Sequence, residues 1–200
     1  MIKNIIFDFG DIFINLDKLA VFKQMALFGF TALTPELDTL AKNYEMGLMS
    51  SESYVAALKD IFPQADAEAI IQAWNSIILD FPEYRLEFIE KLKKENNYRL
   101  FLLSNTNDLH ITFVKETMGI VRYKRFKNCF EQFYLSHEIH MRKPNTNIYE
   151  YVLAQNGLQA NETLFIDDTK ENTESAALLG IKTWNLIVGQ EDITELTNKI

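Results

Sequence analysis

Residues 4–11 of the chain read Asn-Ile-Ile-Phe-Asp-Phe-Gly-Asp, a short apolar run that ends in a carboxylate at Asp8. The run is too short for a helix, and its unbroken apolar character indicates a strand covered on both faces. Similar runs occupy residues 100–103, 164–166 and 183–187, and longer segments with helical spacing occupy residues 84–96, 148–156 and 171–179. Strands that alternate with helices predict an α/β fold with a doubly wound, mostly parallel sheet.

One part of the chain departs from this alternation. Between about residues 17 and 80 the apolar spacing is helical almost throughout, and it predicts no strand. Pro35 after Thr34, Ser51 and Asp66 each mark the start of a helix in this region. We therefore expect a helical cap at residues 17–80, inserted into a core that is formed by residues 1–16 and 81–200.

Composition limits the possible partners and the cellular location. The net charge of −8 and the spread of the lysines along the chain argue against binding to nucleic acid or to an anionic membrane. The sequence has neither an apolar stretch of about 20 residues, which a membrane span needs, nor an apolar signal-peptide core. Cys129 is the only cysteine and can form no intramolecular disulfide, as is usual in a reducing compartment. We expect a cytoplasmic protein.

Polar residues follow three of the predicted strands. Asp8 ends the first run, Ser104-Asn105 the second and Asp167-Asp168 the third. The carboxyl ends of parallel strands meet at one edge of the sheet, where ligands bind. Adjacent carboxylates at such an edge need a compensating cation, and Mg²⁺ prefers oxygen ligands. Lys143, stiffened by Pro144, is in a position to add a positive charge for a phosphate.

Four motifs succeed one another in this order: Phe7-Asp8-Phe9-Gly10, Leu103-Ser104-Asn105-Thr106-Asn107, Met141-Arg142-Lys143-Pro144 and Phe165-Ile166-Asp167-Asp168. Across nearly the whole chain they resemble the motifs of the haloacid dehalogenase-like (HAD) hydrolase superfamily, whose first type of cap is a helical insert after the first strand. Gly10, together with His110 and Asn172, is similar to the subgroup of bacterial glucose-1-phosphatase-like sugar phosphatases.

The resemblance implies a Rossmann-like HAD core and a phosphatase that hydrolyses a small phosphomonoester through an aspartyl-phosphate on Asp8. It implies Ser104 and Lys143 as further catalytic residues, Asn105 and His110 as phosphate or substrate ligands beside them, and Asn172 as a brace for the loop. The Mg²⁺ ligands that it implies are Asp8, the backbone carbonyl of Gly10, Asp167 and Asp168. Substrate contacts from the cap are expected at residues 44–52, and the implied partner is a small phosphorylated metabolite.

Gly10 is the departure that matters most for the chemistry. Most phosphatases of the family carry a second aspartate there, two residues after the nucleophile, as general acid and base. Asp11 is adjacent, but a shift of one residue turns a side chain to the opposite side of an extended segment. His140 stands where relatives usually have glycine, which brings an imidazole near the site or only reflects a tolerated backbone angle. A sugar 1-phosphate, with its better leaving group, needs the missing acid less.

Other functions stay open at this point. A haloacid dehalogenase also uses an aspartyl nucleophile but needs no metal, which Asp167-Asp168 argues against, and it usually carries tyrosine at the position of Gly10. A phosphomutase normally depends on the missing aspartate. A binding protein that keeps the metal site without turnover is the alternative from a different class. The sequence leaves the physiological substrate and the oligomeric state open.

Overall fold

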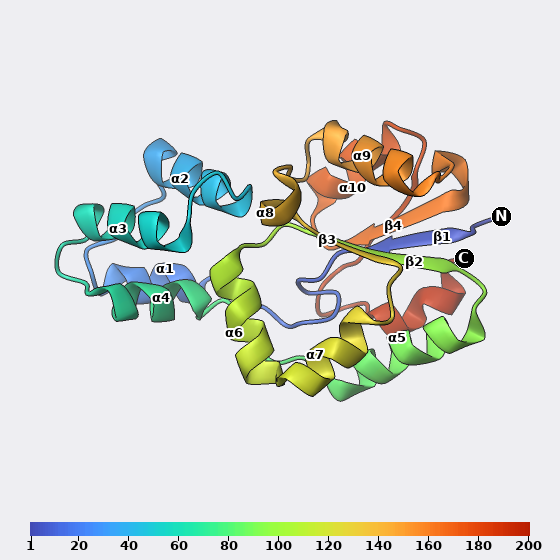
Figure 1. The fold of residues 1–200 in the computed structure, drawn as a ribbon, viewed down its shortest axis with the longest axis horizontal. Helices are drawn as coiled ribbons and strands as arrows, with labels where there is room; N and C mark the ends of the chain where they lie inside the picture. Colours follow the sequence, from blue (N-terminus) through green and yellow to red (C-terminus); the bar gives the residue numbers. More distant parts are fainter.

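The computed structural model describes residues 1–200 and contains a five-stranded sheet in the order β3-β2-β1-β4-β5 (Figure 1). The strands are β1 (Asn4–Phe7), β2 (Arg99–Ser104), β3 (Gln132–Leu135), β4 (Thr163–Asp167) and β5 (Lys182–Asn185). All neighbouring strands are parallel. The predicted doubly wound α/β fold is confirmed.

Helices cover both faces of the sheet because the central strands bury side chains on both faces. Ile5 and Phe7 of β1 pack into one apolar cluster, whereas Ile6 packs into another on the opposite face. The first cluster includes α5 (Glu83–Glu95), α6 (Asp108–Met118), α7 (Ile120–Lys127) and the 3₁₀ helix η2 (Ile193–Asn198). The second includes α9 (Thr146–Asn156) and α10 (Lys170–Ala177). Short helices α8 (Ser136–Ile139) and η1 (Ala160–Glu162) complete the core.

Two predictions about the strands differ from the structure. The edge strand β3 was not expected, because Gln132-Phe133-Tyr134-Leu135 is only partly buried and lacks the continuous apolar character of the central strands. The run at residues 183–187 was expected to be a strand throughout, but β5 ends at Asn185 and Ile187 is exposed. Both differences lie at the edges of the sheet, where a strand buries less of its surface.

Residues 20–75 form four helices with a hydrophobic core of their own. The helices are α1 (Ala20–Ala26), α2 (Pro35–Glu45), α3 (Ser51–Ile61) and α4 (Ala67–Asn75). The side chains of Thr34, Ser50 and Asp66 accept hydrogen bonds from backbone N–H groups in the first turns of α2, α3 and α4, as expected of N-caps. The helix whose start Asp66 marks ends at Asn75, where the chain turns into the connection to the core.

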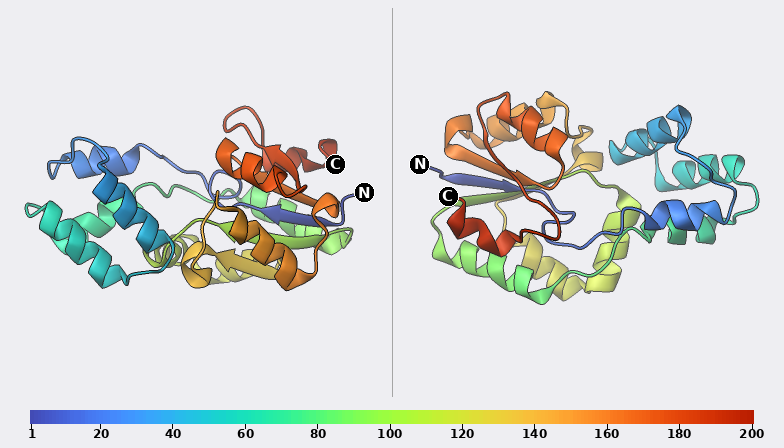
Figure 2. Two further views of the ribbon diagram at one scale, coloured as in Figure 1. Left: turned by 90° about the horizontal axis from the view of Figure 1, so that it is seen from above. Right: turned by 180° about the vertical axis from the view of Figure 1, so that it is seen from behind.

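The two connections between these helices and the core pair with each other. The Asp17 amide donates to the Ile77 carbonyl at 2.8 Å, and the Leu79 amide donates to the Asn15 carbonyl at 3.0 Å. Figure 2 shows the four helices beyond the carboxyl ends of the strands, while both termini lie at the opposite end of the sheet. The insert therefore faces the edge of the sheet where the predicted site residues gather.

Candidate active site

Three strand ends bring the predicted site residues together. Asp8 directly follows β1, whereas Ser104 and Asp167 are the last residues of the flanking strands β2 and β4. Phe7 pairs with Leu102 of β2 on one side and with Ile166 of β4 on the other, so the three polar residues lie at one edge of the sheet.

Lys143 occupies the middle of this group. Its Nζ lies 2.6 Å from Asp8 Oδ1 and 2.6 Å from Asp167 Oδ2, and it donates to the Leu103 carbonyl at 2.9 Å. The side chain is only 1% exposed, so these contacts form away from bulk water. The Asn105 side chain holds the Lys143 backbone, because its Oδ1 accepts from the lysine N–H and its Nδ2 donates to the lysine carbonyl, each at 2.9 Å.

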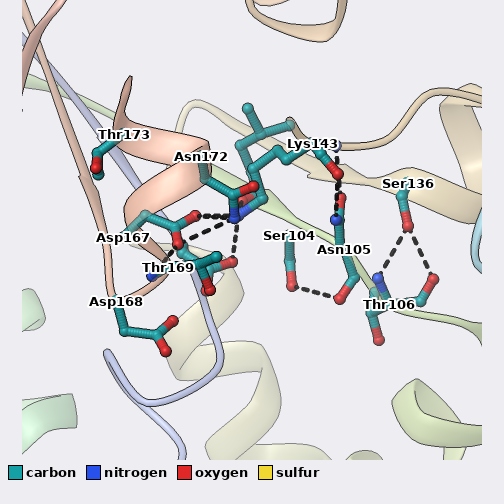
Figure 3. Close-up of polar contacts among 12 residues, drawn as sticks. Ser104, Asn105, Thr106, Ser136, Lys143, Asp167, Asp168, Thr169, Asn172 and Thr173 are labelled. Carbon is teal, nitrogen blue, oxygen red and sulfur yellow. Dashed lines mark hydrogen bonds and ion pairs between the residues drawn. The ribbon is translucent and has the colours of Figure 1, made fainter. Parts of the chain in front are cut away.

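Asp167 is braced from a second direction (Figure 3). Asn172 Nδ2 lies 3.0 Å from one carboxylate oxygen of Asp167 and 3.1 Å from the other, and the Thr169 amide donates to Oδ1 at 2.8 Å. Each oxygen of Asp167 thus accepts a hydrogen bond from a neutral N–H donor, and these bonds fix the orientation of the carboxylate. Asn172 occupies the bracing position that the sequence predicted.

Burial and charge act against each other in this group. Burial raises the pKa of Asp8 to about 7 although Lys143 opposes the rise, and the Asp167 carboxylate adds to it. Burial alone would lower the pKa of Lys143, but the Asp167 and Asp8 carboxylates raise it and keep the ammonium charged. The buried carboxylates of the site therefore carry more negative charge than Lys143 compensates.

The residues present fit a divalent cation. Carboxylate oxygens of Asp8, Asp167 and Asp168 lie within 4.8 Å of one another. With Asp11 close by, four carboxylates gather beside only two ammonium groups, those of Lys143 and Lys18, which leaves an excess of two negative charges. Oxygen ligands and this charge suit Mg²⁺. The backbone carbonyl of Gly10 stays a predicted ligand.

Lys18 was not anticipated from the sequence. Its Nζ lies 2.5 Å from Asp168 Oδ2 and 2.9 Å from Asp11 Oδ2. It comes from the start of the insert, and no motif marks it, since only the folded connection brings it to the sheet edge. Asp11 is engaged on both oxygens, because its Oδ1 accepts the Leu16 amide at 3.1 Å. That arrangement makes Asp11 part of the turn after Gly10.

The structure shows what stands in the place of a side chain at residue 10. A Cβ added to Gly10 would lie 4.0 Å from Asp8 Oδ2 but 2.8 Å from Leu16 Cδ1. A side chain at this position would thus extend beside the nucleophile candidate, where Leu16 now packs. Asp11, the adjacent acidic residue, is held by Lys18 and the Leu16 amide.

His110 lies on the wall of the adjacent cavity with both ring nitrogens in use. Nε2 lies 3.1 Å from the Trp74 carbonyl, and Nδ1 lies 3.1 Å from Asn107 Nδ2. Asn107 Oδ1 accepts the His110 amide and Trp74 Nε1, so its Nδ2 donates to the ring and the histidine carries its proton on Nε2. Burial lowers the pKa of His110 to about 4. These contacts join the insert to the core and leave no ring nitrogen for a phosphate.

The end of α2 closes the site from the side of the insert. Glu45 Oε2 accepts from Arg142 Nη2 at 3.1 Å, and its backbone carbonyl accepts from Ser136 Oγ at 2.6 Å. His140 has a φ of 56°, is exposed, and donates from Nδ1 to the Met46 carbonyl at 2.9 Å. Its imidazole thus contacts the insert, away from Asp8. The predicted substrate segment at residues 44–52 lies against the loops that carry Ser104 and Lys143.

Between the insert and the sheet edge lies a cavity of about 120 Å³. Gly10, Ser104, Asn105 and His110 line it from the core, and Glu45 lines it from the insert. The space is small and partly polar, so it suits a small polar molecule attached to a phosphoryl group at Asp8.

The model of the haloacid dehalogenase-like hydrolase family matches residues 5–186. A D-ribitol-5-phosphate phosphatase of Bacteroides thetaiotaomicron is 27% identical to the chain over 98% of each protein. A solved HAD family enzyme from the same organism, in a complex with magnesium and inorganic phosphate, is 32% identical, has a TM-score of 0.87 and covers 98% of this chain and 99% of its own. A HAD-like family hydrolase from Porphyromonas gingivalis has a TM-score of 0.87 at 27% identity, over 100% of this chain and 98% of its own.

The chain therefore belongs to the haloacid dehalogenase-like hydrolase family, and within it the chain is a phosphatase with Mg²⁺ as its cofactor. The sequence-based assignment of family, fold, enzyme class and cofactor is confirmed. No helix of the structure combines the length and the apolarity that crossing a bilayer requires.

Proposed function

We propose that the protein hydrolyses the phosphate ester of a small sugar or sugar alcohol through an aspartyl-phosphate on Asp8. The observation that carries the proposal is the position of Lys143 Nζ, 2.6 Å from both Asp8 and Asp167, beside a carboxylate group that fits Mg²⁺. The D-ribitol-5-phosphate phosphatase, similar over 98% of its length, supports a polyol or sugar phosphate as the substrate class.

Asp8 acts as the nucleophile in this mechanism. A carboxylate oxygen of Asp8 forms a bond to phosphorus, and the bond from phosphorus to the alcohol oxygen breaks. Because residue 10 is glycine, the departing alkoxide takes its proton from water. Water then attacks phosphorus, releases inorganic phosphate and restores the Asp8 carboxylate. Because Asp8 must be ionised to attack, the positive charge of Lys143 beside it favours the reactive form.

The other residues at the sheet edge position the phosphoryl group. Lys143 neutralises charge on the transferring oxygens, and Ser104 donates a hydrogen bond to them, while Asn105 holds the Lys143 backbone in place. Asp8, the Gly10 carbonyl, Asp167 and Asp168 would hold Mg²⁺, which supplies further neutralisation of phosphoryl charge when bound. His110 orients Asn107 and Trp74, so we assign it a positioning role.

We propose residues 17–80 as a mobile cap over a core of residues 1–16 and 81–200. The paired connections and the separate hydrophobic core of the four inserted helices support this division. A cap that rests on the site excludes water while phosphorus is under attack by Asp8.

Phosphate release from a panel of sugar and polyol phosphates tests the proposal. We expect release with Mg²⁺, little release in EDTA, and a loss of at least about 1,000-fold in kcat for Asp8→Asn, which removes the nucleophile. Glu36→Gln, a change on the exposed first turn of α2, is the control that should keep full activity.

Other outcomes would replace the proposal. Absence of release from every ester, with Mg²⁺ binding intact, would indicate a phosphoryl-ligand-binding protein without turnover. Release of halide from a haloacid without metal would indicate a dehalogenase.

A further inference from the structure

We propose that Glu45 selects the leaving group: its carboxylate accepts hydrogen bonds from the hydroxyls of a neutral polyhydroxylated alcohol and repels an alcohol that carries a second negative charge. This inference rests on the proposed function and names the substrate class of the same site. It concerns the part of the substrate that departs, whereas Asp8 and Lys143 handle the phosphoryl group.

The position of the cavity carries the first step of the argument. Gly10, whose added Cβ would lie 4.0 Å from Asp8 Oδ2, belongs to the cavity wall together with Ser104. The cavity wall thus begins beside Asp8, and we place in this space the ester oxygen and the alcohol of a substrate whose phosphoryl group is at Asp8. Glu45 is the one charged side chain among the lining residues, and the insert supplies it.

Glu45 is held in place through only part of its carboxylate. Arg142 donates to Oε2 from Nε at 3.2 Å and from Nη2 at 3.1 Å, and no side chain or backbone donor of the protein reaches Oε1. Ser136 Oγ holds the Glu45 backbone carbonyl at 2.6 Å. A fixed carboxylate with one free oxygen is a strong acceptor for hydroxyl groups.

The neighbouring polar groups are already in use. Both ring nitrogens of His110 and both ends of the Asn105 amide have partners within the protein. Arg142 is paired with Glu45, so a carboxylate or second phosphate on the leaving group would meet a negative charge and no free cation in this cavity. Specificity of this kind comes from an unfavourable contact for the wrong substrate as well as a favourable one for the right substrate.

Glu45→Gln tests the inference, because it keeps the size and removes the charge. The readout is the ratio of kcat/KM for D-ribitol 5-phosphate to kcat/KM for phosphoglycolate, a small ester with an anionic leaving group. We expect this ratio to fall at least about tenfold in Glu45→Gln and to keep its native value in Glu36→Gln. Glu45→Asp, which keeps the charge but draws it back, should lower kcat/KM for the polyol ester while still discriminating against the anionic one.

A ratio that stays unchanged in Glu45→Gln, or an equal loss on both esters, would overturn the inference. Thermal melts show whether each variant is folded. If Glu45→Gln does not fold, the loss of kcat/KM for the polyol ester in Glu45→Asp tests the inference instead. Failure of the proposed function gives a different result, because the native chain would then release no phosphate from any ester.

Discussion

Lys18 forms an ion pair with Asp168, one of the carboxylates that we propose as Mg²⁺ ligands. Although burial opposes it, the hydrogen bonds to Asp168 and Asp11 raise the pKa of Lys18, so the ammonium stays charged at every physiological pH. Its Nζ lies 2.5 Å from Asp168 Oδ2, which cannot serve the ammonium and a metal ion equally well at once. Binding of Mg²⁺ and the Lys18–Asp168 ion pair should therefore compete.

We expect Lys18→Met to bind Mg²⁺ more tightly, by roughly threefold or more, because the variant loses a competing cation. Titration calorimetry with MgCl₂ alone measures this. Lys23→Met is the matched control, since Lys23 pairs with Asp17 at 3.6 Å and touches no carboxylate of the site. Weaker binding in Lys18→Met would mean that Lys18 organises the ligands instead of competing for them.

His110 should make the stability of the protein depend on pH. Its pKa is lowered from 6.5 to about 4 in the folded state, so the unfolded chain binds more protons between these values. The free energy of unfolding should thus fall as the pH decreases from 6.5 to about 4, by about 3 kcal/mol from this residue. Urea denaturation at several pH values should show a shallower decline for His110→Gln; an unchanged decline would contradict the assignment of His110 as a buried neutral residue.

Residues in motifs could be predicted from the sequence, and residues that act through tertiary contact could not. Asp8, Ser104 and Asp167 each follow an apolar run of the sequence, and Lys143 precedes Pro144. These local signals predicted the sheet edge at which the structure has them. Lys18 reaches the site only because the connections fold back on each other, a contact between distant residues that no local spacing reveals.

Burial decided which strands of the sheet could be recognised from the sequence. The central strands β1, β2 and β4 have buried apolar runs and were predicted within two residues at each end. The edge strand β3 runs from an exposed Gln132 through two partly buried residues to a buried Leu135, and it gives no such pattern. Helix starts at residues 35 and 67 were predictable because their N-cap side chains have a local chemical role.

The turn after α2 packs tightly against the core. Gly47 has a φ of 63°, and a Cβ added there would lie 2.1 Å from the His137 carbonyl oxygen of α8. Only glycine allows this approach, which places Glu45 beside Arg142.

We expect Gly47→Ala to lower the free energy of unfolding by about 2 kcal/mol or more, because it adds a clash with backbone to the strain of a positive φ. Gly29→Ala is the control: Gly29 has a φ of 96°, but an added Cβ has no atom within 4 Å. Urea denaturation of both variants separates strain from contact. Equal losses in the two would show that the approach to His137 is not tight.

The insert contacts the core through hydrogen bonds that involve a side chain on at least one side, and it is joined to the core by two connections that pair through their backbones. The Leu109 amide donates to Tyr44 Oη at 3.1 Å across the contact, whereas the Asp17 and Leu79 amides pair within the connections. On this basis we propose that the inserted helices lift from the core while the connections stay intact.

Hydrogen exchange tests this division into moving parts. We expect saturating Mg²⁺ and inorganic phosphate to slow exchange at Leu109 several-fold by holding the cap closed, with little change at Asp17 and Leu79. Equal slowing at all three amides would contradict a cap that moves about its connections.

In the proposed mechanism Asp8 forms a covalent bond to the phosphoryl group. This bond can be detected by acid quenching of the enzyme during turnover of a polyol phosphate with Mg²⁺, followed by digestion and mass spectrometry. We expect a phosphoryl group on the peptide that contains Asp8, absent when EDTA replaces Mg²⁺ and absent in Asp8→Asn. Continued phosphate release by Asp8→Asn at the native rate, with no phosphorylated peptide in either protein, would contradict it.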